Sequence, residues 1–224
     1  TTLHLFRTDK MILLSRLTLS LFVAAMTGAC SPVSSDTNAQ TPARQNLLTT
    51  VEANASADAA ESCLLMAWSE QEDTDIEFDR ANDTVKGGAI SCATGATPSQ
   101  FEAAISALRD AAKSGNKARI LDQLGIPLLY ISHDGERQEL SREQIDALFD
   151  DVFDARMLDL LQRLDLSKMT VEKDQGAFFE LGSLWLVVDE DGHPRVMTVN
   201  RQALDEAAVA ARDQAERGQG ERID

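Results

Sequence analysis

The order of two hydrophobic periodicities along the chain is the feature that most constrains its fold. Between residues 97 and 164, apart from one strand-like segment at 127–132, apolar side chains recur at helical spacing, and between residues 169 and 199 they fall in short β-rich segments. A parallel βαβ sheet needs helices and strands that alternate. Helices followed by strands argue against that sheet and predict an α+β fold.

Two capping boxes mark the starts of predicted helices. Thr97-Pro98-Ser99-Gln100 opens a helix that ends at Gly115. Ser141-Arg142-Glu143-Gln144 opens a second helix, whose pattern breaks at Asp154 and then resumes. Between these two, a shorter helix is expected to end before Gly125 and to carry three apolar residues: Ile120, Leu121 and Leu124.

Five short segments have the composition of strands. They span residues 127–132, 169–172, 177–181, 183–189 and 195–199. The first of them turns at Asp134-Gly135, and the last four are separated by turn sequences such as Asp191-Gly192. These four segments predict an antiparallel meander.

The first thirty residues have the pattern of an export signal. An uncharged apolar run from Leu17 to Met26 follows Lys10 and Arg16. The run is about ten residues long, well short of the roughly 20 that a membrane-spanning helix needs. We therefore interpret residues 1–29 as a signal peptide, with Met11 as an alternative start.

The residues at the end of this signal, Met26-Thr27-Gly28-Ala29-Cys30, resemble the lipobox of bacterial lipoproteins. The resemblance implies that Cys30 is acylated, as by palmitate, becomes the mature N-terminus and anchors the chain to a membrane. Thr27 departs from the usual Leu, and the alternative is an ordinary secretory signal in which Cys30 is incidental. Ser31 at the next position implies an outer-membrane anchor that faces the periplasm.

Residues 30–61 are rich in Ser, Thr, Ala, Asn and Gln and predict a disordered tether, because they have too little apolar surface to form a core. The whole chain carries a formal charge of -16, which repels both a nucleic-acid backbone and anionic lipid headgroups. Nucleic acid is therefore not an expected partner. The folded domain is expected to stand away from the bilayer on its tether.

With Cys30 assigned to acylation, two cysteines remain, Cys63 and Cys92. An even number in an oxidising compartment favours one disulfide. The pair lacks the C-x-x-C spacing of a redox motif, and neither cysteine has a histidine at the spacing of a zinc site. No metal or cofactor is expected.

Several short motifs occur in a fixed order between Phe101 and Asn200. They are Ser114-Gly115-Asn116, Ile126-Pro127-Leu128, Phe149-Asp150-Asp151-Val152-Phe153, and finally Gly176, Gly182 and Trp185. This order resembles envelope members of the nuclear transport factor 2-like superfamily. The resemblance implies that residues 62–200 form a cone, in which helices pack on a curved antiparallel sheet with a cavity at the wide end. It implies no activity, because such folds serve enzymes and binding modules alike.

Three residues are candidates for lining that cavity: Tyr130, Glu180 and Trp185. Strand alternation would place Glu180 on the same face as Phe178, either inside the cone or as an ordinary strand charge in water. Trp185 is expected to be buried, and Gly182 to mark a bulge or tight bend. No catalytic residue is assigned, because the two histidines of this region, His133 and His193, lie in predicted turns.

Residues 201–224 predict a helix through about Glu216 that frays at Gly218 and Gly220. Its apolar stripe is narrow and consists of Leu204, Ala208, Ala211 and Ala215. A small-residue stripe can receive a partner helix, although a solvated and weakly packed helix is the alternative interpretation.

Together these features predict an envelope lipoprotein with a non-catalytic binding or scaffold domain. Its candidate partners are the membrane, through the lipid, and an envelope protein or a small ligand. The alternative hypothesis is a periplasmic hydrolase or isomerase that uses the cone cavity. That enzyme would need a convergent acid–base pair, which the sequence does not offer.

Overall fold

The structure is a computed structural model, and it describes residues 58–219. The predictions for the signal peptide, for Cys30 and for residues 31–57 lie outside the described residues. After helical residues 58–69 come α2 (Ile76–Asn82), β1 (Thr84–Val85), β2 (Gly88–Ala89), α3 (Ile90–Thr94), α4 (Pro98–Ser114), α5 (Lys117–Leu121), β3 (Leu124–Ile131) and β4 (Arg137–Leu140). Then follow α6 (Arg142–Ala147), α7 (Phe149–Val152), α8 (Ala155–Gln162), η1 (Leu166–Lys168), β5 (Thr170–Glu172), β6 (Gly176–Phe179), η2 (Glu180–Gly182), β7 (Leu184–Val188), β8 (Pro194–Asn200) and α9 (Arg201–Gln219).

The main sheet has six strands in the order β4-β3-β8-β7-β6-β5, and it is open at β4 and β5. The meander from β5 to β8 is antiparallel, as predicted. The expectation of a wholly antiparallel sheet is wrong, because β3 and β8 pair in parallel. After the β3–β4 hairpin the chain runs through α6, α7 and α8 to the opposite edge of the sheet, where β5 begins. The meander then leads back across the sheet and places β8 beside β3. The fold is α+β with a mixed sheet.

The predicted capping boxes are both present. Thr97 accepts a hydrogen bond from the Gln100 backbone N–H and α4 ends at Gly115 in the left-handed conformation. Ser141 caps α6 in the same way. The predicted single helix after Ser141 is interrupted at Leu148, where α7 begins as a separate turn, and α8 starts after Asp154 as expected.

The short helix before Gly125 is shorter than predicted. α5 ends at Leu121, and Leu124 and Gly125 belong to β3. Gly125 lies against β8, where a Cβ atom would come within 1.9 Å of the Met197 sulfur. The glycine at this position therefore lets β3 and β8 lie close together, and it does not end a helix.

The strand predicted through Leu181 ends at Phe179 instead. Glu180, Leu181 and Gly182 form the η2 turn with φ values of 39°, 58° and 88°, all in the left-handed region. This turn confirms the prediction of a tight bend at Gly182. A Cβ atom there would also lie only 3.0 Å from the Trp185 indole nitrogen. Strand alternation therefore does not apply to Glu180.

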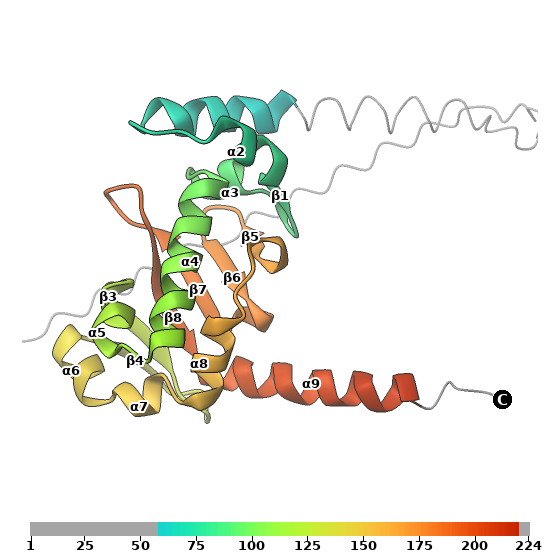
Figure 1. Cartoon of the computed structure of the whole chain (residues 1–224). Helices are drawn as coiled ribbons and strands as arrows, with labels where there is room; N and C mark the ends of the chain where they lie inside the picture. Colours follow the sequence, from blue (N-terminus) through green and yellow to red (C-terminus); the bar gives the residue numbers. More distant parts are fainter. Residues whose placement is uncertain (1–57, 220–224) are drawn as a thin grey trace, which may run out of the picture. The chain divides into compact units, whose positions relative to one another are not determined.

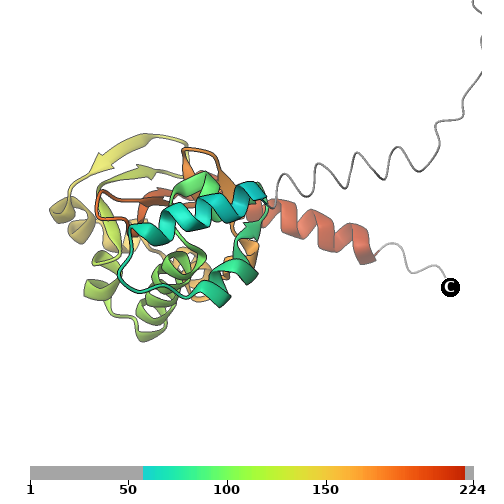
Figure 2. The same cartoon turned by 90° about the horizontal axis from the view of Figure 1, so that it is seen from above.

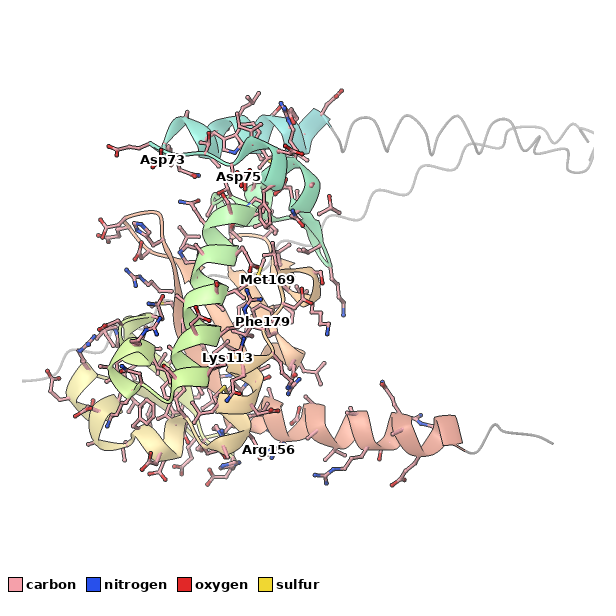
Figure 3. All side chains as sticks on the ribbon, in the orientation of Figure 1. Asp73, Asp75, Lys113, Arg156, Met169 and Phe179 are labelled. Atoms are coloured by element: carbon pink, nitrogen blue, oxygen red, sulfur yellow. A yellow bond between two sulfur atoms is a disulfide. The ribbon has the colours of Figure 1, made fainter. Side chains whose placement is uncertain are left out.

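The core lies between one face of the sheet and the helices α4 and α8 (Figure 1). α4 contributes its fully buried large side chains Phe101, Ile105 and Leu108. Met169 and Phe179, which follow η1 and end β6, are buried in the same core (Figure 3). The predicted apolar face of α4 is thus the helical half of the core.

The predicted disulfide between Cys63 and Cys92 is present, and it joins the first described helix to α3. Trp68 on that helix donates a hydrogen bond to the buried Asp79 of α2, with an Nε1–Oδ2 distance of 2.7 Å. Residues 58–61, which were expected to belong to the tether, are already helical. Figures 1 and 2 show this helix lying across the end of the domain at which α4 begins.

The last helix, α9, continues through Gly218 to Gln219 instead of fraying after Glu216. Its first turn is packed against the domain, with Arg201, Ala203 and Leu204 buried. From Ala211 to Arg217 every residue is exposed. These later turns extend away from the sheet (Figures 1 and 2).

Candidate functional site

The three candidate pocket residues do not form one site, because the register places Tyr130 and Trp185 on opposite faces of the sheet. Trp185 is paired with Thr198, and Thr198 with Leu129. Tyr130 belongs to the neighbouring row, since Val199 pairs with both Tyr130 and Leu184. Neighbouring rows project to opposite faces of a sheet.

Trp185 was expected to be buried, and the structure shows it half-buried. Its ring lies 4.6 Å from that of Phe178, measured between centroids, on the face of the sheet away from α4. Trp185 therefore packs against Phe178 and does not share a face of the sheet with Tyr130.

Tyr130 is half-buried and packs against the core. Burial raises the pKa of its hydroxyl; the positive charge of Arg201 opposes this shift, and nearby carboxylates led by Asp151 add to it. Tyr130 therefore stays protonated at neutral pH and fills space in the core.

Glu180 is exposed and forms an ion pair with Arg163, with a 3.4 Å distance between Oε1 and Nη1. Arg163 also pairs with Asp159 at 3.0 Å. Burial acts to lower the pKa of Arg163, but the two carboxylates outweigh it and raise that pKa. A guanidinium that holds its proton so firmly is neither a general acid nor a general base near neutral pH.

Glu180 nevertheless lies at the edge of a groove of about 720 Å³ between α8, η2 and α9, which we call the α9 groove. The apolar part of its lining is Ala155, Leu181, Leu204, Ala207, Ala208, Ala210 and Ala211. The charged part is Arg156, Asp159, Arg163 and Glu180. Leu181 is 64% exposed although it is apolar. A long apolar floor with a charged rim suits the docking of a helix better than acid–base chemistry.

Two arginines fix α9 to α8 and so hold the groove open. Arg201 is fully buried and forms a bidentate ion pair with Asp154, the residue that caps α8. Arg156, labelled in Figure 3, pairs with Asp205 and donates a second hydrogen bond to the Leu204 carbonyl oxygen at 3.2 Å. In the sequence, Asp154 is recognisable only as a helix break, and no local pattern marks either arginine as its neighbour.

The environment of Asp154 favours its ionised form. Partial burial acts to raise the pKa of this carboxyl, but the Arg201 guanidinium and the backbone N–H groups of Met157 and Arg156 outweigh burial, so the pKa is lowered. Asp154 therefore carries a negative charge at neutral pH and neutralises the buried Arg201.

A second hollow, of about 500 Å³, lies beside the disulfide and includes Cys92, Met66 and Asp174 in its lining. Cys92 is exposed there, and Met66 is 72% exposed. His133 and His193 are exposed in turns, as expected. His133 bonds to Asp205 with a 2.6 Å distance between Nδ1 and Oδ2. Neither histidine lines the α9 groove.

Within residues 58–219, no group of three or more histidine, cysteine or acidic side chains is arranged to hold a metal ion. The helices of this same part of the chain include none that is long and apolar enough to cross a membrane. Comparisons with protein-family models, curated proteins and solved structures found no match for the chain.

Proposed function

We propose that this chain is a lipoprotein of the bacterial cell envelope whose α+β domain binds a partner without catalysing a reaction. Cys30 carries the lipid, and residues 31–57 connect it to the domain on the periplasmic side of the outer membrane. The α9 groove is the binding surface. The observation that carries this proposal is the apolar lining of the groove; Glu180 lies at its edge and is already paired with Arg163.

The disulfide supports the location. Cys63 and Cys92 are joined, and such bonds persist in exported proteins and are rare in the cytosol. The resemblance to the nuclear transport factor 2-like cone remains part of the proposal. The packing of α4 and α8 on one face of a six-stranded sheet supports it.

The alternative, a periplasmic hydrolase or isomerase, requires a titratable pair that can exchange protons in a cavity. Glu180 was the candidate for such a pair, and its observed partner is the guanidinium of Arg163. This contact favours binding over proton transfer, so we prefer the binding module.

The anchor is tested by mass spectrometry of the mature N-terminus together with membrane fractionation. We expect an acylated Cys30 in the wild type and release from membranes for Cys30→Ser. Ser31→Asp is the matched control, because it keeps the acylation site and is expected to shift the protein to the inner membrane. A mature N-terminus without acylated Cys30 would contradict the anchor.

The absence of catalysis is tested by complementing a deletion strain. Glu180→Gln keeps the size of the side chain and removes its charge, and we expect it to restore the wild-type phenotype. Glu190→Gln, an exposed site in the β7–β8 turn, is the control. If Glu180→Gln folds and reaches the membrane but fails to complement while the control succeeds, the enzyme hypothesis replaces the binding module.

A further inference from the structure

The first described helix is attached to the domain without being part of its core. Residues 58–69 carry two buried side chains, Leu64 and Ala67. Neither belongs to the contiguous hydrophobic core of the described residues, to which this helix contributes no side chain. In Figure 1 the helix lies outside the layers formed by α4 and the sheet. Release of this helix would therefore leave the core intact.

The non-covalent contacts of this helix are modest. Glu61 pairs with Arg80 of α2, but these side chains are 40% and 55% exposed, and exposed ion pairs contribute little to stability. Trp68 donates one hydrogen bond to Asp79. Most of the stability of a helix in a protein comes from tertiary packing. A helix with two buried side chains therefore depends on a further attachment.

The Cys63–Cys92 disulfide is that attachment, because it joins the helix to α3, and Ile90 of α3 belongs to the core. The bond is also accessible. Both cysteines line the hollow of about 500 Å³ described above, which we call the disulfide hollow. Cys92 is exposed and Cys63 is half-buried. Thiol–disulfide exchange needs such access for the attacking thiolate.

We propose that this disulfide is a redox-sensitive clasp. A dithiol that enters the disulfide hollow reduces the bond, and residues 58–69 then leave the domain while the core stays folded. The released segment ends before Gln71, which donates a hydrogen bond to Gln100 of α4 with a 3.1 Å distance between Nε2 and Oε1. The clasp goes beyond the binding role of the α9 groove and does not depend on it.

The exchange has two steps. A thiolate of the dithiol attacks the sulfur of Cys92, the more exposed cysteine; a bond forms between these two sulfurs, the Cys63–Cys92 bond breaks, and Cys63 leaves as a thiolate that takes up a proton. The second thiolate of the dithiol then attacks the dithiol's own first sulfur. This attack closes the dithiol into a disulfide and releases Cys92 as a thiolate that takes up a proton. Two electrons and two protons thus pass from the dithiol to the two cysteines.

The charge of the disulfide hollow selects among reductants. Glu70 and Asp174 lie in its lining, and the described residues that form this lining include no lysine, arginine or histidine. The whole chain adds a formal charge of -16. Repulsion slows the entry of a reductant that carries a negative charge beyond its thiolate. A reductant without such a charge therefore suits the hollow better.

Opening of the clasp uncovers a buried carboxylate. Asp79 is fully buried and accepts hydrogen bonds from the Trp68 indole N–H and the Ser99 backbone N–H, each at 2.7 Å. Departure of Trp68 removes one of these donors and lets water reach the carboxylate. In the proposed lipoprotein, the released residues also lengthen the chain between Cys30 and the domain, and this consequence alone rests on the proposed function.

The experiment uses the exported protein, kept in native membranes or purified from whichever fraction contains it. The protein is incubated with dithiothreitol without denaturant, free thiols are alkylated, and peptide mapping assigns each label to its cysteine. We expect Cys63 and Cys92 to become labelled under these native conditions. We also expect 2-mercaptoethanol to react faster than 2-mercaptoethanesulfonate, a thiol of the same length that carries an added negative charge.

Hydrogen exchange with mass spectrometry then follows the helix. On reduction, residues 62–69 are expected to lose protection by about tenfold or more, the size of effect that cross-links of this kind have on stability, while α4 stays protected. Combined Cys63→Ser and Cys92→Ser substitution is expected to give the same loss without a reductant. Glu61→Gln is the matched control, because it removes an exposed contact of the same helix, keeps the disulfide, and is expected to leave the protection unchanged.

Cysteines that become labelled only after the protein has been unfolded would overturn the proposal. A helix that stays protected after reduction would do the same, as would reduction that removes the protection of α4 together with that of the helix. A faster reaction with the anionic thiol would overturn the disulfide hollow as the entry of the reductant. Peptide mapping separates Cys30 from the other two cysteines, so failure of the clasp would leave the proposed anchor and binding module standing.

Discussion

The two longest helices that the structure describes, α4 with 17 residues and α9 with 19, use the same periodicity for different purposes. The stripe of α4 is built from large side chains such as Phe101 and Ile105, which are fully buried under the sheet. The stripe of α9 is built mostly from alanines, and it is exposed from Ala211 onward. Large apolar side chains stabilise the fold through the area they bury, whereas alanines bury little area but allow close approach.

The comparison separates a helix that stabilises the domain from one that is available to a partner. It also explains the difference in how the helices are held. α4 is held along its whole length by the core, but α9 is held at its first turns by the Arg201–Asp154 and Arg156–Asp205 ion pairs. The following substitutions test this division.

The largest expected effect is in the core stripe. Phe101→Ala removes a fully buried ring and is expected to reduce the free energy of unfolding by about 3 to 5 kcal/mol. Val209→Ala, on an exposed side of α9, should change it by less than about 0.5 kcal/mol. Urea unfolding followed by circular dichroism measures both free energies. Equal losses of stability in the two variants would contradict the distinction between a core helix and an exposed one.

The attachment of α9 depends on Asp154. Asp154→Asn leaves the buried Arg201 without a negative partner, and we expect a loss of about 3 kcal/mol in the free energy of unfolding. Asp159→Asn, an exposed partner of Arg163, is the control and should cost less than about 1 kcal/mol.

The same contact predicts a pH dependence. The pKa of Asp154 is lowered in the folded protein, so its contribution to stability is present above the usual value of 3.8 and is lost as the pH falls through the folded-state pKa. Urea unfolding at several pH values should show a smaller acid-induced loss of stability in Asp154→Asn than in the wild type. An unchanged loss in the variant would contradict this role for the ion pair.

A smaller contrast comes from enlarging an alanine on each helix. Ala111→Leu inserts volume into the packed core beneath α4 and is expected to lower the free energy of unfolding by about 1 to 3 kcal/mol. Ala211→Leu is exposed and should leave that free energy within about 0.5 kcal/mol of wild type at low protein concentration. A large loss at Ala211 would mean that the alanine stripe of α9 stabilises the monomer.

The smallest expected effect is at the N-terminal caps. Thr97 caps α4, and Asn200 accepts a hydrogen bond from the Ala203 backbone N–H at the start of α9. Each replacement by Ala should cost about 1 kcal/mol of helix stability. We expect the cost at Thr97 to appear in global unfolding and the cost at Asn200 to appear as faster amide exchange in α9 alone. Hydrogen exchange with mass spectrometry distinguishes the two.

Local features of the fold could be predicted well because they depend on neighbouring residues. The capping boxes at Thr97 and Ser141 and the bend at Gly182 follow from hydrogen bonds and backbone angles within a few residues. The disulfide followed from the count of cysteines. The parallel pairing of β3 with β8 could not be predicted in this way, because it depends on a crossover through three helices.

The candidate site was predicted poorly for a related reason. Alternation along a strand placed Glu180 on the face of Phe178, but the left-handed residues of η2 end the strand before Glu180. Tyr130 and Trp185 were grouped as aromatics, and only the register assigns them to opposite faces. Arg201 carries no local signal of burial, since its partner Asp154 lies 47 positions earlier. The narrow alanine stripe was visible in the sequence, but the groove that it lines was not.

The most direct test of the account is amide hydrogen exchange of the wild-type protein. We predict that residues 211–217 of α9 exchange rapidly, because they are exposed, while α4 is protected by the core. Protection of residues 211–217 equal to that of α4 would contradict the division between a helix that stabilises the domain and one that is available to a partner.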